Sequence, residues 1–213
     1  MHAPRKKALR SSLGGRPQKQ HRQEQILGAA FKVFAAQGYE AARLDEVAER
    51  AGVAKGTIYL YFRDKKQLFR AVVRSLLKKR MDAVAGTSGG SAEDQLRTLV
   101  SRMYAEIVSN ERVRSIVRLL IAESGRFPEL ADIYHREIIA PGMKAVRRVL
   151  MQGIASGEFR ETPALEFPQI LAAPGVLAIV WRALHGERRR LDLHAYRKAH
   201  LEFILGSLRR KPV

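Results

Sequence analysis

The residues best suited to chemistry lie in one short stretch, from Lys55 to Lys65, and their types suit contacts with a polyanion. Lys55 can donate a hydrogen bond to a phosphate or to a guanine edge, and Thr57 can offer a hydroxyl to a phosphate or a methyl group to thymine. Gly56 lies between them and has no side chain, which lets the backbone approach DNA closely. A glycine inside a helix costs about 1 kcal/mol against alanine, so its presence there needs a reason.

Tyrosine and lysine side chains continue this pattern. Tyr59 and Tyr61 are two residues apart, which is about 200° around a helix, so they cannot both face a core. Tyr61 also falls on an apolar position of the pattern described next, so we expect it to be partly inside. Lys65 lies at the expected start of the following helix, where unpaired N–H groups and the helix dipole favour a phosphate. The stretch therefore predicts a helix with one face turned to nucleic acid.

Two short helices are needed to position these side chains, and the residues from Leu44 onward predict both. Ala48 would occupy the helix crossing, where a larger side chain would push the helices apart, and Gly52 would occupy a turn that usually needs a positive φ. The packing positions of this twenty-residue window are Val47, Ala51, Val53, Ile58 and Tyr61. The pattern predicts a helix-turn-helix, which presents its second helix to the major groove of DNA.

The residues of this window resemble those of TetR-family transcriptional regulators. The resemblance covers residues 20–77 and is carried by LDEVA at 44–48, AGV at 51–53, AKGTIYLYF at 54–62, RDKKQLF at 63–69, and Ala29, Ala30, Phe34, Gly38 and Tyr39 before them. Residues 121–130 are similar to one branch of TetR-like regulators. The resemblance implies that Tyr59, Tyr61 and Lys65 approach DNA phosphates.

Two arginines extend the candidate DNA-binding set. At Arg43 the family usually has a threonine or serine that caps the second helix and contacts phosphate. Arginine cannot cap in the same way, so we expect a charge contact with phosphate instead. Arg16, within the sequence Gly15-Arg16-Pro17, partly resembles the minor-groove core of an AT-hook. The alternative is a cationic tail without groove preference.

Positive charge gathers in the first third of the chain. Of 213 residues, 39 are Lys or Arg and 21 are Asp or Glu, which gives a formal charge of +18. Residues 1–80 hold 19 basic and 6 acidic residues, a net of +13, and residues 81–213 hold 20 and 15, a net of +5. Such a localised field suits a polyanion. A charge for solubility and binding to an anionic membrane surface are the alternatives.

Composition and motifs exclude several other classes. The absence of cysteine excludes a disulfide scaffold, a thiol nucleophile and a thiolate zinc site. No apolar run reaches the roughly 18 residues that span a bilayer, and basic residues interrupt the N-terminus where a secretory signal is apolar. Hydrolase, zinc-protease, phosphate-loop and dinucleotide motifs do not occur, and His194 and His200 are not spaced for one helical face. We expect a cytoplasmic protein that is no enzyme and has no metal or cofactor.

Helical periodicity continues along the chain and predicts an all-α protein of about nine helices. We expect a flexible basic arm at 1–17, a three-helix DNA-binding domain with the helix-turn-helix at 18–66, and a larger helical ligand-binding and dimerisation domain at 67–213. In the larger domain, the apolar spacing predicts separate helices at 128–134 and 138–155.

Capping signals predict where several helices begin. Asp64 with Gln67 reads as a capping box, Ser91 and Asp192 are expected to precede helices, and Gly38 is expected to end one. Thr162-Pro163 predicts the start of a helix that runs to Leu184, because proline is favoured at the first helical position.

The resemblance further implies a ligand cavity in the larger domain and a dimer formed by its last two long helices. Residues 165–184 are apolar on nearly every side, so we expect a two-fold partner to cover the remaining face, with burial in the monomer as the alternative. The candidate interface residues are Val176, Ile179, Val180, Phe203 and Ile204. The candidate cavity residues are Met103, Tyr104, Ile107, Phe127, Tyr134, His135 and Trp181, and plain core packing is the alternative for each.

The sequence predicts a homodimeric DNA-binding transcriptional regulator of TetR type. We expect it to bind a roughly palindromic operator in double-stranded DNA, to act as a repressor, and to be released by a small-molecule inducer that shifts the separation of the two recognition helices. The alternatives are a ligand-independent, nucleoid-like DNA binder and a peripheral binder of polyanions or membrane surfaces that uses the basic arm.

Overall fold

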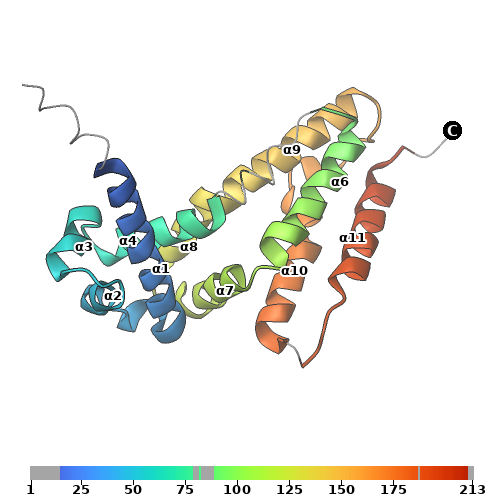
Figure 1. Ribbon diagram of the computed structural model, residues 1–213. Helices are drawn as coiled ribbons and strands as arrows, with labels where there is room; N and C mark the ends of the chain where they lie inside the picture. Colours follow the sequence, from blue (N-terminus) through green and yellow to red (C-terminus); the bar gives the residue numbers. More distant parts are fainter. Residues whose placement is uncertain (1–14, 79–81, 83–88, 187, 211–213) are drawn as a thin grey trace, which may run out of the picture. The chain divides into compact units, whose positions relative to one another are not determined.

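The computed structural model describes residues 15–78, 82, 89–186 and 188–210, which are helical almost throughout (Figure 1). An isolated bridge between Phe159 and Arg209 is the single β-type contact among these residues. Counted with π-helical turns joined to the helices they continue, the described residues form nine helices. The prediction of an all-α fold is confirmed.

The chain divides into two compact units, residues 1–72 and 73–213. The helices of the first unit are α1 (Gly15–Ala41), α2 (Leu44–Arg50), α3 (Lys55–Tyr61) and α4 (Lys65–Val73). The second unit contains η1 (Arg74–Lys78), α6 (Ala92–Arg102), η2 (Met103–Val108), α7 (Glu111–Glu123), α8 (Pro128–Tyr134), η3 (His135–Ile139), α9 (Ala140–Ala155), η4 (Pro163–Leu165), α10 (Gln169–His185) and α11 (Leu193–Leu208). Of these, η1, η2 and η3 are π-helical and η4 is a 3₁₀ turn.

The boundary between the units falls six residues later than the sequence suggested, because α4 packs on the core of the first unit. The ring of Phe69 lies 5.5 Å from the rings of both Phe34 and Tyr39, edge to face, and all three are buried. At the other end, α1 begins at Gly15, inside the segment expected to be an arm. The rest of that arm, residues 1–14, lies outside the described residues.

Local signals place the helices of the first unit as expected. Gly38 interrupts the helical path of α1 with a φ of 84°, and Gly52 forms the turn after α2 with a φ of 64°. Ala48 is buried where α2 packs on α3. The amide of Gln67 donates to the carboxylate Oδ1 of Asp64 at 2.6 Å, which caps the start of α4.

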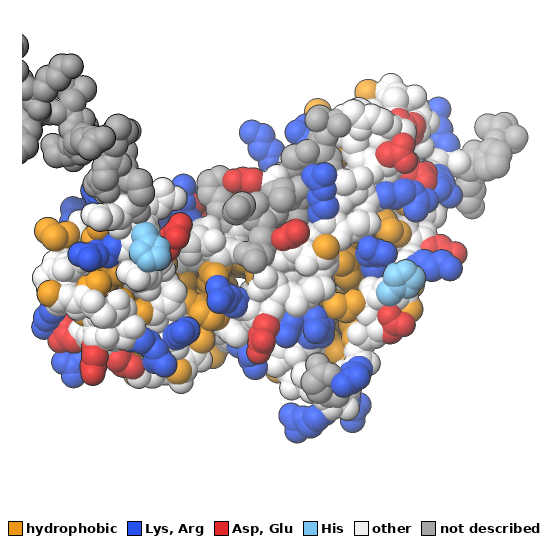
Figure 2. All heavy atoms as spheres, in the orientation of Figure 1, with side chains coloured by type: hydrophobic (Ala, Val, Ile, Leu, Met, Phe, Trp, Pro, Cys, Tyr) orange, Lys and Arg blue, Asp and Glu red, His pale blue; other side chains and the backbone are white. Residues whose placement is uncertain are grey.

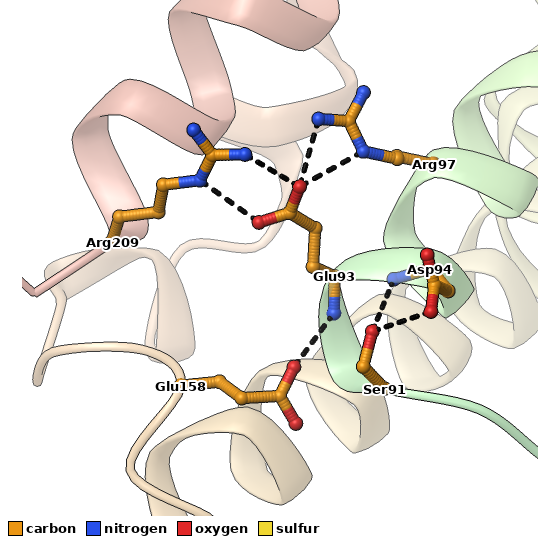
Figure 3. A network of polar contacts seen from close by, with 6 residues as sticks. All are labelled: Ser91, Glu93, Asp94, Arg97, Glu158 and Arg209. Carbon is orange, nitrogen blue, oxygen red and sulfur yellow. Dashed lines mark hydrogen bonds and ion pairs between the residues drawn. The ribbon is translucent and has the colours of Figure 1, made fainter.

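The second unit is tied together where its first and last long helices meet, at the start of α6 (Figure 3). The guanidinium of Arg209 donates to both carboxylate oxygens of Glu93 at 2.6 and 2.8 Å, and Arg97 donates to the same carboxylate. Hydrogen bonds from Arg209 and then from Arg97 lower the pKa of Glu93 to about 2. Ser91 and Glu158 accept hydrogen bonds from two amides in the first turn of α6, those of Asp94 and Glu93, and so cap this helix end.

Two expectations about the second unit are wrong. Thr162-Pro163 begins only the short turn η4, and α10 starts six residues later at Gln169, because Pro168 supplies no amide hydrogen and disfavours helical geometry at the residue before it. Residues 128–155 form one uninterrupted helical path instead of two helices. The π-helical η3 absorbs the shift in apolar phase between α8 and α9.

Candidate DNA-binding surface and ligand cavity

The helix α3 buries one face and leaves the other to solvent. Ile58 is fully buried against the neighbouring helices, whereas Lys55, Gly56 and Tyr59 are exposed. Thr57 and Tyr61 are intermediate, and the ring of Tyr61 lies 6.3 Å from that of Phe62. The exposed side of α3 therefore carries the ammonium group of Lys55, the phenol of Tyr59 and, at Gly56, backbone that no side chain covers.

Lys55 is held by an ion pair within the same surface. Its Nζ lies 2.9 Å from Oδ2 of Asp45 on α2, and this hydrogen bond is the main cause that raises the pKa of Lys55. Both side chains are largely exposed, so the pair is of the weak surface kind. A phosphate at this position would compete with Asp45 for the same ammonium group.

Lys65 is positioned by the preceding turn. Its Nζ donates to the backbone carbonyl of Glu40 at 2.7 Å and lies 4.9 Å from the centre of the Tyr39 ring. The carbonyl uses one of the three hydrogens of the ammonium group, which leaves donors for an outside acceptor. The end of α1 thus orients a cation at the start of α4.

The fold itself does not require glycine at position 56. A Cβ built there meets no heavy atom within 4 Å, and Gly56 is absent from the glycines with positive φ. Gly56 is the second residue of α3, and neither packing nor backbone conformation within the described residues accounts for glycine there.

Sequence reasoning missed Leu60, which is 84 % exposed and the most exposed large apolar side chain among the described residues. It lies about 200° around α3 from the buried Ile58 and four residues after Gly56. Both residues are thus on the side of α3 that faces away from the core. Helical spacing from the buried Ile58 predicts this outward position, although leucine itself carries no polar donor.

The two arginines differ in what the structure describes. Arg43 precedes α2 with an extended backbone, makes no side-chain cap and is exposed, as expected for a residue that cannot cap. Arg16 lies in the first turn of α1, and its side chain is outside the described residues.

An apolar cavity lies within the second unit. Its described walls come from α6, η2, α8, η3, α9 and α10, and consist of Leu96, Leu99, Val100, Met103, Ile107, Tyr134, Ile138, Ile139, Gly142, Met143, Ala145, Val146, Leu171, Ala172, Val176 and Ile179. Met103 reaches close to α10 because residue 175 there is glycine, and a Cβ on Gly175 would overlap its thioether.

Tyr134 supplies the single hydroxyl among these wall residues. That hydroxyl makes no hydrogen bond with any described residue, and burial raises the pKa of Tyr134 to about 12. Tyr134 is partly exposed as a residue, and its hydroxyl, which has no described partner, is available to an acceptor on a bound molecule.

Three of the seven candidate cavity residues lie in this wall: Met103, Ile107 and Tyr134. The other four lie elsewhere. Phe127 precedes α8, and His135 lines a separate groove on α9. The indole N–H of Trp181 donates to the carbonyl of Arg189 at 3.1 Å.

Tyr104 belongs to a buried polar link instead of the cavity. Its hydroxyl lies 3.1 Å from Nδ1 of His200 on α11, and Nε2 of His200 lies 2.9 Å from the carbonyl of Leu171 on α10. Because the carbonyl accepts, Nε2 carries the hydrogen and Nδ1 accepts from Tyr104. Burial lowers the pKa of His200 and raises that of Tyr104 to about 12. The link joins η2, α10 and α11.

The candidate dimer residues separate into two groups. Ile179 and Ile204 are buried within the chain, at 5 % and 1 % exposure, so neither is free to meet a partner. Ile179 and Val176 also line the cavity. Phe203 is 71 % exposed and Val180 is intermediate. The structure thus corrects the prediction for Ile179 and Ile204, which face the core of their own unit.

Val176 is 49 % exposed, and three further residues carry the exposed apolar face of α10. Ile170, Leu177 and Leu184 are spaced by seven, lie on one side of the helix and are 53 %, 56 % and 63 % exposed. Figure 2 shows apolar side chains at the surface in the region of α10 and α11. We name the surface formed by these three residues and Phe203 the α10–α11 face.

A helix-turn-helix with a cationic outer face, followed by a helical unit around an apolar cavity, is the arrangement of a DNA-binding transcriptional regulator. Residues 26–72 match the family model of bacterial regulatory proteins, tetR family, and residues 87–196 match that of the tetracyclin repressor-like C-terminal domain. Together the matches cover well over half of the chain. The protein belongs to the TetR family of bacterial regulatory proteins, and its function is that of a DNA-binding transcriptional regulator.

Relatives and solved structures agree with this assignment. The chain is 28 % identical over 148 residues to the fatty acid metabolism regulator protein of Bacillus subtilis, covering 68 % of this chain and 74 % of that protein. The transcriptional regulator FadR from Bacillus subtilis, solved with stearoyl-CoA, superposes with a TM-score of 0.68 at 22 % identity, covering 86 % and 98 % of the two chains. A regulator from Saccharomonospora viridis, solved with choline, gives 0.69 at 22 %, covering 90 % and 100 %.

These matches do not favour the two alternatives, a nucleoid-like DNA binder and a peripheral membrane binder. Within the described residues, no helix is long and apolar enough to cross a membrane. The relatives found are transcription regulators and not enzymes.

Proposed function

We propose that this regulator binds its operator through the outer face of α3 and the start of α4. Lys55, Thr57 and Tyr59 supply donors, and Gly56 lets the α3 backbone approach the DNA. Arg43, Tyr61 and Lys65 bind phosphates beside them, and Arg16 adds a cation from the first turn of α1. The observation that carries the proposal is Gly56, an exposed residue in the first turn of α3 at which nothing in the fold requires glycine.

We further propose that two copies pair through the α10–α11 face, which places two α3 helices on one roughly palindromic site. One recognition helix reads only a half-site, so useful specificity needs two, about one helical turn or a multiple apart. The spacing of Ile170, Leu177 and Leu184 supports this pairing, since a stripe at intervals of seven suits packing between helices. The expected site of action is the cytoplasm, where operator DNA is found.

The inducer we propose is a molecule with a long apolar chain and one hydrogen-bond acceptor. The cavity wall is aliphatic apart from Tyr134, whose free hydroxyl suits a carbonyl oxygen. A quaternary ammonium ligand such as choline suits it less well, because such cations favour aromatic cages, and the described wall residues include one aromatic ring and no acid. The fatty-acid regulators among the relatives support an acyl compound. Binding releases DNA if the ligand favours a spacing of the two α3 helices that does not fit the operator.

Substitution of Lys65 distinguishes phosphate contacts, which position the protein on DNA, from base contacts, which recognise the operator sequence. Lys65→Ala should weaken binding to operator and to random DNA alike and lower the slope of log affinity against log salt by about one, because it removes one phosphate contact. Thr57→Ala should instead reduce the preference for operator, by roughly 1–3 kcal/mol if Thr57 reaches a base edge. Fluorescence anisotropy on a duplex selected by the protein from a random library, and on an unrelated duplex, measures both. A loss of sequence preference alone in Lys65→Ala would reverse the two roles.

Filling the cavity tests the proposed inducer. Ala172→Phe places a ring among the wall residues, so stearoyl-CoA should release the operator only at concentrations about tenfold or more above those that suffice for the wild type. Operator affinity without ligand should stay within about twofold. Ala131→Phe, at an exposed position of α8 outside the wall, is the matched control. Release of both variants at the wild-type concentration would show that the ligand does not occupy this cavity.

A further inference from the structure

Leu60 is a large apolar side chain on the helix of the proposed operator contact. It is 84 % exposed, more than any other large apolar side chain among the described residues. A single exposed leucine is ordinary on a protein surface. Its position on α3 and the groups around it therefore have to show what it does.

The position of Leu60 is the outermost on α3. At 100° per residue, Gly56 and Leu60 each lie within about 20° of the line directly opposite the buried Ile58. Tyr59 lies on one flank of this line and Thr57 on the other. When α3 enters a groove with Ile58 toward its own domain, Gly56 and Leu60 go in deepest.

A helix and the major groove have matching widths, about 10–12 Å for a helix with its side chains and about 12 Å for the groove. The flanks of an inserted helix therefore face the two phosphate backbones, and its outermost line faces the edges of the bases. The space beside Leu60 on this line is open, since a Cβ built on Gly56 meets no heavy atom within 4 Å. A base edge can reach the backbone at Gly56 and the side of Leu60 together.

The chemistry of a leucine selects among base edges. In the major groove these edges present hydrogen-bond donors and acceptors, and one apolar group, the C5 methyl of thymine. Leucine neither donates nor accepts, so a polar edge pressed against it loses water without gaining a partner, which costs free energy. The charge of α3 suits nucleic acid, because the helix carries Lys55 and no acid.

We infer that Leu60 is a specificity-determining residue that contacts the C5 methyl group of one thymine in each half-site of the operator. This inference rests on the proposed function, and it adds a base that each half-site contains. The missing side chain at Gly56 allows the close approach that the contact needs. Lys55 and Tyr59, on the flank of α3, supply polar contacts beside it.

Deoxyuridine tests the contact, because it lacks only the methyl group of thymidine and pairs with adenine in the same way. In the duplex selected by the protein from a random library, each thymine position is replaced in turn, in both half-sites together. For the wild type we expect one position at which affinity falls by about fifteenfold, which is about fourfold for each methyl group. For Leu60→Ala the fall at that position should be less than about twofold. Fluorescence anisotropy measures both.

Thr57→Ala is the matched control, since threonine also carries a methyl group and lies on the flank of α3. It should keep the full effect of deoxyuridine at the position that Leu60 contacts. If Thr57→Ala removes this effect and Leu60→Ala keeps it, Thr57 contacts the thymine and the inference is overturned. Leu60 is exposed, so its truncation leaves the core unchanged, and thermal melting checks this. The deoxyuridine scan of the wild type needs no variant at all.

The failures of the inference and of the proposed function are distinguishable. If the wild type prefers the selected duplex but tolerates deoxyuridine at every position, or if the selected half-sites share no thymine, the inference is overturned while operator binding through α3 stands. If selection yields no preferred duplex, the proposed function fails, and the inference fails with it. If Leu60→Ala changes the oligomeric state in sedimentation velocity and leaves the effect of deoxyuridine intact, Leu60 contacts protein instead of thymine.

Discussion

Raising the salt concentration from 50 to 200 mM is expected to weaken operator binding by about 10³–10⁵-fold. This is the effect of about 6–10 phosphate contacts, each of which displaces counterions from DNA. Two copies of the cationic surface around α3 and α4 supply that number, with Arg43, Lys55 and Lys65 as the candidates in each copy. Anisotropy titrations with the selected duplex at four or five salt concentrations measure the slope directly.

The ion pair between Lys55 and Asp45 offers an internal control for this slope. Asp45→Asn removes the competitor for the Lys55 ammonium group and one negative charge from the DNA-facing surface. Binding should become tighter at every salt concentration, for operator and random duplexes alike. An affinity of the wild type that hardly changes with salt would contradict the interpretation of the N-terminal charge as an electrostatic footprint.

Charge on the α10–α11 face is expected to weaken operator binding strongly, although none of the proposed DNA-contacting residues is changed. Leu177→Glu with Phe203→Glu places carboxylates on two exposed apolar residues, where pairing would bury them without partners. The variant should be monomeric, and its operator affinity should fall by roughly 10²–10⁴-fold, because the second half-site then no longer binds as part of the same molecule. Sedimentation velocity and anisotropy on the same sample give both quantities.

The choice of these residues makes the outcome interpretable. Leu177 and Phe203 are exposed, so charge there leaves the core of the unit intact, whereas Ile179 and Ile204 are buried and charge there would unfold it. Ile121→Glu is the control, since Ile121 is 64 % exposed on α7 and outside this face. A wild type that is monomeric at micromolar concentration and yet binds its operator tightly as a single copy would refute the proposed dimer.

The features that the sequence predicted correctly depend on residues close together in the chain. The turn at Gly52, the crossing at Ala48 and the caps at Asp64, Ser91 and Asp192 each involve partners within a few residues. Such short-range geometry is the same in any tertiary setting, so residue types at fixed spacing are sufficient to predict it. The helix-turn-helix and the all-α class were predicted for this reason.

Other outcomes depended on competition between local signals. Pro163 favours a helix start, but Pro168 removes an amide five residues later and limits that start to one turn. The helix through residues 128–155 is continuous because the π-helical η3 includes the three polar residues 135–137. Apolar spacing alone predicts an interruption at these residues. The helix boundaries in these two segments therefore depend on all the residues of the segment, and no single proline or apolar signal predicts them.

Burial in the second unit was decided by tertiary structure alone. Tyr104 and Trp181 are aromatic residues at helical spacing like Tyr134, but only Tyr134 borders the cavity, whereas Tyr104 bonds to His200, 96 residues away. Ile179 and Leu177 are two residues apart on an apolar helix, and one is buried while the other is exposed. An all-round apolar helix has no hydrophobic stripe that marks its inner side, so the neighbouring helices determine which face lines the cavity and which remains for a partner.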